Sequence, residues 1–230
     1  MKILAMDTSF TRGGVALLDG ERPVAVADFA GAEGHVALLP RTLDGLLRES
    51  GWRLGDVERI GVTLGPGTFS GARIALGLAK GIHVALGTPV AGFSTLEVVA
   101  AGSGVTGDVA AILDARRGEV YAAIFSIDGN RPPEMLLAPG VWEPERLMED
   151  LKGWRHRTGA GFFLTGDGLG VYGERFQPLL DQECRPVESS VWPLDVVLLG
   201  RLTARLAGGA WPLVEALEPL YIRRADAKEL

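Results

Sequence analysis

The sequence has 230 residues, of which 47% are hydrophobic and 23% are charged, a composition typical of one large globular domain or two small ones. Its formal net charge of -6 argues against a surface that binds polyanionic nucleic acid directly, because such binding needs clustered Lys and Arg side chains. Cys184 is the one cysteine, which excludes an intrachain disulfide and a cysteine-based zinc site. The first residues lack the apolar core of a signal peptide. No stretch of the sequence reaches the roughly 18 uninterrupted apolar residues that a membrane-spanning helix needs, so we expect a cytoplasmic protein with no membrane role.

The first half of the chain alternates between short apolar runs and turn-forming residues. Three runs at its start predict a strand meander over residues 2–7, 14–19 and 23–29. Val36, Leu39, Leu43, Leu46 and Leu47 then recur at helical spacing, with Gly51 as a stop, which predicts an amphipathic helix. A strand over 59–64, a helix over 70–86 and a strand over 89–93 are predicted to follow.

The second half repeats this order. Strands are predicted to end at Asp114 and at Asp128, with a candidate third strand in "EMLLAPG". A helix in "WEPERLMEDLKG", a strand entering the glycine turn "TGDG" and a closing helix with Pro193 near its start and Gly208 at its end are predicted next. The order βββαβα therefore occurs twice, which predicts two similar α/β lobes over residues 1–104 and 105–230, the second ending in a tail.

The stretch "GPGTFSG" is a glycine-rich turn between a predicted strand and a predicted helix. Gly65, Gly67 and Gly71 do not have the spacing of the dinucleotide fingerprint, and Lys80 lies too far away for a Walker loop. We interpret the turn as structural, with anion binding at the helix N-terminus as the alternative, in which Gly67 would approach the ligand.

The helix after this turn carries two rows of small residues at four-residue spacing. One row is Gly71, Ala75 and Ala79, and the other is Gly77, Gly81 and Ala85. An interior glycine costs about 1 kcal/mol relative to alanine, so we expect a compensating contact. Small residues allow close approach, which predicts a neighbouring helix from this chain or from a partner.

Asp7 and Asp114 each end the first strand of a repeat, the place where one class of two-lobed ATPases holds metal and phosphate. The first copy continues with small hydroxylated residues, whereas the second places Arg116 and Arg117 where a phosphate-binding hairpin needs small ones. ATPase chemistry is therefore disfavoured. No metal site is predicted, because the position four residues after His35 is a leucine.

The segments "MKILAMDTS", "HVALLPRTLDGLL", "GPGTFSGARIALGLAKG", "ILDARRGEVYAAIF", "TGDG" and "PLYIRR" together resemble the bacterial TsaB (YeaZ) family. This resemblance implies the fold of the actin, Hsp70 and sugar kinase (ASKHA) superfamily. It also implies an accessory subunit of tRNA threonylcarbamoyladenosine (t6A) synthesis, similar to M22 glycoproteases but with no catalytic residue, metal or cofactor of its own.

The partners that the resemblance implies are a TsaD-like catalytic subunit and a TsaE-like ATPase, with a homodimer when the catalytic subunit is missing and tRNA contacted only indirectly. The implied interface uses the first-lobe helices. Its expected residues are His35, Leu39, Leu43, Leu46, Gly71, Ala75 and Ala79. The alternative is a nucleotide-dependent phosphotransferase or hydrolase of the same fold that uses Asp7 and Asp114; a glycoprotease ranks lowest because the metal ligands are missing.

Overall fold

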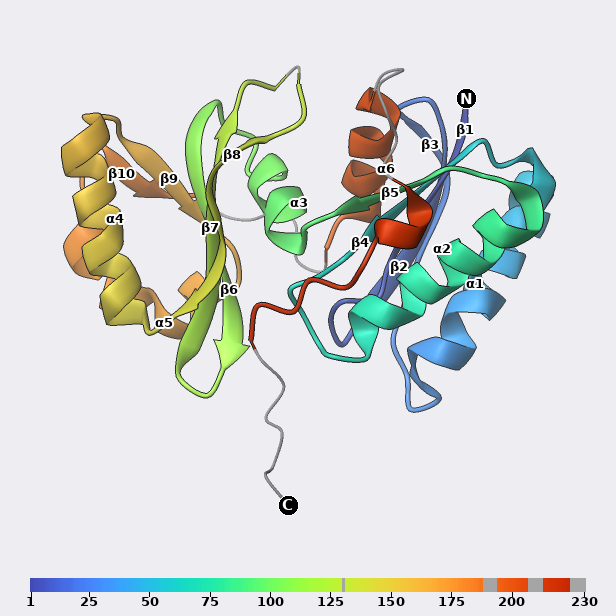
Figure 1. The fold of residues 1–230 in the computed structure, drawn as a ribbon, viewed down its shortest axis with the longest axis horizontal. Coiled ribbons are helices and arrows are strands. Elements are labelled where there is room, and N and C mark those ends of the chain that lie inside the picture. The colour runs from blue at the N-terminus through green and yellow to red at the C-terminus, as the bar shows by residue number, and fades with distance from the viewer. Residues whose placement is uncertain (130, 188–193, 207–212, 224–230) are drawn as a thin grey trace.

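The computed structural model describes residues 1–129, 131–187, 194–206 and 213–223. Two five-stranded sheets lie side by side, with α1 (Gly34–Ser50) and α2 (Gly71–Leu86) outside the first and α4 (Pro144–Thr158) outside the second (Figure 1). In the part of the chain that is described, no helix is long and apolar enough to span a membrane.

The first sheet has the strand order β3-β2-β1-β4-β5. Its strands are β1 (Lys2–Asp7), β2 (Gly13–Asp19), β3 (Arg22–Phe29), β4 (Arg59–Thr63) and β5 (Val90–Phe93). The first three pair antiparallel, and β4 and β5 continue parallel to β1. Because side chains alternate along a strand, Leu4 and Met6 pack with α1 and α2, whereas Ile3 and Ala5 belong to a core shared with the second lobe.

The second sheet has the same arrangement, with the order β10-β9-β6-β7-β8. Its strands are β6 (Gly107–Arg116), β7 (Glu119–Ile127), β8 (Glu134–Trp142), β9 (Phe162–Thr165) and β10 (Cys184–Pro186). Ile112 and Ile124 of this sheet form a core with Leu147 of α4 and Phe176 of α5 (Gly168–Phe176). The two lobes therefore repeat one topology, as the duplicated strand order predicted.

The observed order is βββαβαβα in both halves. The elements that were not predicted are α3 (Thr95–Ala101) in the first half and α5 and β10 in the second, whereas the predicted closing helix is α6 (Val196–Arg205). Short 3-10 helices occur at Leu54–Asp56 (η1), Gln177–Leu179 (η2) and Val214–Ala216 (η3). Helix α5 stands directly after the segment that we interpreted as a glycine turn, and Asp167 is its N-cap residue.

The closing helix α6 packs on β1, β2 and β4 of the first sheet. A Cβ at Gly61 would overlap the Thr203 hydroxyl, and a Cβ at Gly200 would overlap the Leu18 side chain, so both glycines allow the close approach of helix and sheet. This packing contradicts the assignment of the closing helix to the second lobe; the boundary at residue 104 stays a prediction. The expected helix ends, Pro193 and Gly208, lie outside the described residues.

After η3 the chain runs along the first lobe. Val214 and Leu217 are buried in the core that also contains α1 and α2, and the Leu220 N–H donates to the Leu64 carbonyl at 2.6 Å. The described part of the tail, up to Arg223, therefore packs on the body of the protein.

Candidate functional site

The glycine turn crosses directly over the connection between β1 and β2. A Cβ at Gly67 would overlap the Ser9 carbonyl oxygen, and a Cβ at Gly71 would overlap that of Thr8. The Thr8 hydroxyl donates to the Gly71 carbonyl at 2.6 Å and accepts from the Ala75 N–H at 3.1 Å. Contacts within the chain thus account for both glycines and for part of the helix start, which favours the structural interpretation of the turn.

Asp7 is 2% exposed, and its carboxylate is hydrogen-bonded to residues of the first lobe. Its carboxylate accepts hydrogen bonds from the Ser9 N–H at 3.1 Å and from the Thr63 hydroxyl. Burial raises the pKa of Asp7 above its ordinary value, and these hydrogen bonds act in the opposite direction. A carboxylate enclosed in this way does not face a ligand between the lobes.

Asp114 is also engaged by its surroundings. It accepts from the Arg116 N–H at 2.8 Å and the Tyr172 hydroxyl at 3.2 Å, and it forms an ion pair with the Arg116 guanidinium at 3.2 Å. Its own N–H donates to Asp167, whose pKa is raised mainly by burial. Arg116 and Arg117 have φ angles of 62° and 58°, a region in which non-glycine residues are uncommon, so this hairpin is both bulky and conformationally restricted.

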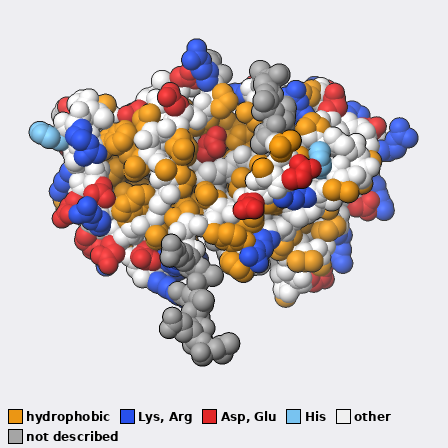
Figure 2. Space-filling model, viewed as in Figure 1, with side chains coloured by type: hydrophobic (Ala, Val, Ile, Leu, Met, Phe, Trp, Pro, Cys, Tyr) orange, Lys and Arg blue, Asp and Glu red, His pale blue; other side chains and the backbone are white. Residues whose placement is uncertain are grey.

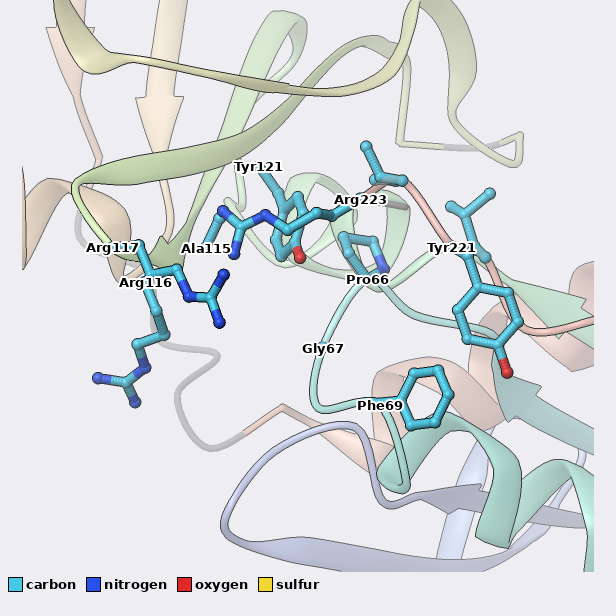
Figure 3. Close-up of a pocket in the computed structure, with 11 residues that line it drawn as sticks. Pro66, Gly67, Phe69, Ala115, Arg116, Arg117, Tyr121, Tyr221 and Arg223 are labelled. Atoms are coloured by element: carbon cyan, nitrogen blue, oxygen red, sulfur yellow. The ribbon is translucent and has the colours of Figure 1, made fainter. Parts of the chain in front are cut away.

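Two adjoining cavities lie between the glycine turn and this hairpin. The smaller, of about 130 Å³, is lined by Gly67, Asp114 and Asp167 among others, but Asp7 is not part of its lining. The larger, of about 470 Å³, is bounded by residues of the turn, the hairpin and the tail. Figure 3 shows the Arg223 side chain and one of the two hairpin arginine side chains extending into the space between these walls, while the other hairpin arginine points away from Phe69 and Tyr221. The predicted pair Asp7 and Asp114 therefore does not meet in one site, whereas Gly67 and Asp114 do.

The predicted docking residues form part of the first-lobe core. Those that the structure buries there are Leu39, Leu43, Leu46, Gly71, Ala75 and Ala79. The prediction that they present a surface to a partner is wrong, because the apolar stripe of each helix covers its own sheet. His35 is half-buried: its Nε2 lies 3.1 Å from the Thr11 carbonyl oxygen, and its ring packs edge-on against Phe29.

The outward face of α2 carries the other row of small residues. Gly77 and Gly81 are exposed, and a Cβ at either position would have no neighbour within 4 Å. Val84, on the same face, is 85% exposed. Figure 2 shows hydrophobic side chains together with both basic and acidic ones on the part of the surface where α2 and the adjoining tail lie in Figure 1. A helix of a monomer normally has a polar outward face, so this apolar one is typical of a helix that something else covers.

A family model described as TsaD, tRNA N6-adenosine threonylcarbamoyltransferase, matches residues 30–159. The tRNA threonylcarbamoyladenosine biosynthesis protein TsaB of Escherichia coli K12 is 36% identical over 97% of this chain and 95% of its own length. The chain belongs to the TsaB (YeaZ) family. The solved structure of YeaZ from Pseudomonas aeruginosa agrees, with 30% identity, a TM-score of 0.77 and coverage of 96% of this chain and 99% of that one.

The fold of this TsaB-family chain is that of the ASKHA superfamily. The ROK hexokinase of Thermus thermophilus has only 15% sequence identity, yet it superimposes over 89% of this chain and 98% of its own with a TM-score of 0.50. At that identity the likeness concerns the fold alone. The features of this chain that bear on its function are the buried Asp7, the Asp114 that pairs with Arg116 in the cleft, and the exposed outward face of α2.

Proposed function

We propose that the chain is a non-catalytic subunit of the t6A machinery, which holds and activates a TsaD-family catalytic subunit together with a TsaE-family ATPase. In this role it supports threonylcarbamoyl transfer to N6 of adenosine 37 of tRNA in the cytoplasm. Its curated relatives carry the name of a t6A biosynthesis protein, and the net charge of -6 fits a subunit that contacts tRNA mainly through others.

The outward face of α2 is the observation that carries this proposal. Gly77 and Gly81 lower the helix propensity of α2 without serving a contact in the chain, and Val84 lies exposed beside them. A helix of the partner could pack closely across the two glycines and remove Val84 from water, which would explain why all three residues are tolerated on this face. The same surface would pair with a second copy of this chain when the catalytic subunit is absent.

The competing function is a nucleotide-dependent phosphotransferase, and the cavity of about 470 Å³ beside Arg116 and Arg223 favours it. The environment of Asp7 argues against this function. Its carboxylate is buried and hydrogen-bonded to Ser9 and Thr63, so it cannot position a metal in the described conformation. Incubation of the isolated chain with ATP and Mg²⁺, followed by measurement of released phosphate, distinguishes the two functions. We expect no phosphate release; magnesium-dependent ATP hydrolysis that is lost in Asp7→Ala would overturn the accessory role.

Reconstitution tests the proposal directly. The catalytic and ATPase subunits from the same organism are incubated with a tRNA transcript and a threonylcarbamoyl donor, with and without this chain, and t6A is measured by mass spectrometry of nucleosides. We expect formation of t6A to depend on the chain and to fall in Gly81→Leu. Gly170→Leu is a matched control, because a Cβ at this exposed glycine of α5 also has no neighbour within 4 Å.

One result would contradict the proposed role, and another would contradict only the proposed docking surface. If t6A forms equally fast without the chain, the activating role is wrong. If Gly81→Leu binds the catalytic subunit as tightly as the wild type does, the role survives but α2 is not the docking surface.

A further inference from the structure

Arg73 lies in the first turn of α2, one helical turn before Gly77, and is held between two aromatic rings. Its guanidinium carbon is 3.9 Å from the centre of the Phe69 ring and 5.3 Å from that of Tyr221, and its Nε donates to the Tyr221 hydroxyl. The two rings lie 5.5 Å apart. Phe69 is 57% exposed and Tyr221 is 48% exposed, so a partner that covers the outward face of α2 could also contact this cluster.

No carboxylate in the described part of the chain forms an ion pair with Arg73. Helix α2 contains no acidic residue at all from Gly71 to Leu86, while it contains Arg73 and Lys80. Lys80 is seven positions after Arg73, so the two lie on the same flank of the helix, two turns apart. The Lys80 ammonium donates to the Glu215 backbone carbonyl at 3.4 Å, which also places it on the side of the tail.

The stacking preorganises the Arg73 side chain to bind a carboxylate. Because Phe69 and Tyr221 fix the side chain, binding loses less side-chain entropy than it would with a free arginine. The Nε is used by Tyr221, and the remaining guanidinium N–H groups are those that match the two oxygens of a carboxylate. Arginine and tyrosine next to an apolar contact surface are also the residues that most often dominate protein interfaces.

A second copy of this chain does not supply the required charge through α2. If two copies of α2 packed antiparallel about residue 79, midway between Gly77 and Gly81, Arg73 would lie opposite Ala85 of the second copy. Lys80 would lie near Lys80 of the second copy, on the same side of the pair, where like charges repel. Self-association over this face is therefore penalised, and a helix with acidic residues is favoured.

We propose that Arg73, positioned by Phe69 and Tyr221, binds a carboxylate of the partner subunit and thereby selects an acidic helix of that subunit over a second copy of this chain. The inference rests on the proposed function, because it concerns the same face of α2. It adds the chemical nature of the partner surface: small or apolar residues over the glycines, and an acidic residue toward the tail of this chain.

The test measures binding of the purified TsaD-family subunit from the same organism by calorimetry at several salt concentrations. Arg73→Met keeps an unbranched side chain that replaces the aliphatic part of the arginine, and it removes the charge; we expect roughly 10- to 100-fold weaker binding and a smaller dependence on salt. Arg73→Lys restores the charge but not the planar fork, and should recover only part of the affinity. Self-association of Arg73→Met, measured by sedimentation, should be unchanged or stronger.

Arg146→Met is the matched control, since Arg146 is an exposed arginine of α4 on the other lobe. Thermal melting of each variant excludes a loss of binding through unfolding. If Arg73→Met binds with the affinity and salt dependence of the wild type while Gly81→Leu does not bind, the inference about Arg73 is wrong and the proposed function stands. If Arg73→Met weakens self-association as much as it weakens partner binding, the selectivity is wrong. If the wild-type chain does not bind the catalytic subunit at all, the proposed function is wrong, and the inference about Arg73 is wrong with it.

Discussion

Replacing both exposed glycines of α2 by alanine should stabilise the isolated chain. Gly77 and Gly81 are in the helix interior, neither has a positive φ angle, and an added Cβ would meet no neighbour within 4 Å. Each substitution therefore gains only the difference in helix propensity, about 1 kcal/mol, and the pair gains about 2 kcal/mol. For a chain of this size that corresponds to a rise in Tm of roughly 4 to 8 °C.

Thermal unfolding followed by circular dichroism measures this directly for Gly77→Ala/Gly81→Ala. Gly87→Ala is the control with the opposite sign, because Gly87 ends α2 with a φ of 73°, where a Cβ costs about 1 kcal/mol. An unchanged or lowered Tm of the double variant would refute the claim that these glycines serve no contact within the chain. A rise in Tm accompanied by weaker binding of the catalytic subunit would instead show stability given up for docking.

Two further predictions concern stability. Burial raises the pKa of Glu97 from 4.5 to about 7, so the stability that this carboxyl group contributes is complete below pH 4.5 and is lost as the pH rises to about 7. In urea unfolding, Glu97→Gln should be more stable than the wild type at pH 8, by on the order of 3 kcal/mol, and similar at pH 4.5; a difference independent of pH would contradict this. Leu43 is buried in α1, so Leu43→Asp should lower the unfolding free energy by about 2–5 kcal/mol, while Asp44→Leu, at the exposed neighbouring position, changes it by less than about 0.5 kcal/mol. Equal Tm values for these two variants would show that Leu43 is not a core residue.

Local patterns predicted most of the elements but not which face of a helix is covered. The leucines of α1 have an unambiguous period of 3.6, and the helix ends at Ser50, just before Gly51 in the left-handed conformation, as expected. Helix α2 has small residues on two faces, so its periodicity could not distinguish the row that packs on β1 and β4, which contains Ala75, from the row of Gly77 that faces solvent. The positions of the charged residues would have identified the solvent-facing row, because Arg73 and Lys80 both flank the row that contains Gly77.

The elements that were missed depend on contacts between distant residues. Helices α3 and α5 have 7 and 9 residues, too few for a periodicity to stand out, and α5 begins within a glycine-rich segment that also suits a turn. The return of α6 to the first sheet rests on the approach of Thr203 to Gly61. A pairing between residues so far apart leaves no mark on a local pattern.

The duplication places equivalent aspartates in the two lobes, and the contacts of these aspartates differ from the contacts of the outward face of α2. Asp7 ends β1 and Asp114 lies near the end of the equivalent strand β6, and each carboxylate is paired within its own lobe, the first with Thr63 and the second with Arg116. An aspartate whose oxygens are already bonded must lose those contacts before it can hold a metal or a phosphate, which is costly in a buried site. The outward face of α2 has no such contacts to lose: covering Val84 and closing over Gly77 removes apolar surface from water. Binding free energy is therefore more accessible on the helix than in the cleft, which is the balance expected of a subunit that acts by holding another protein.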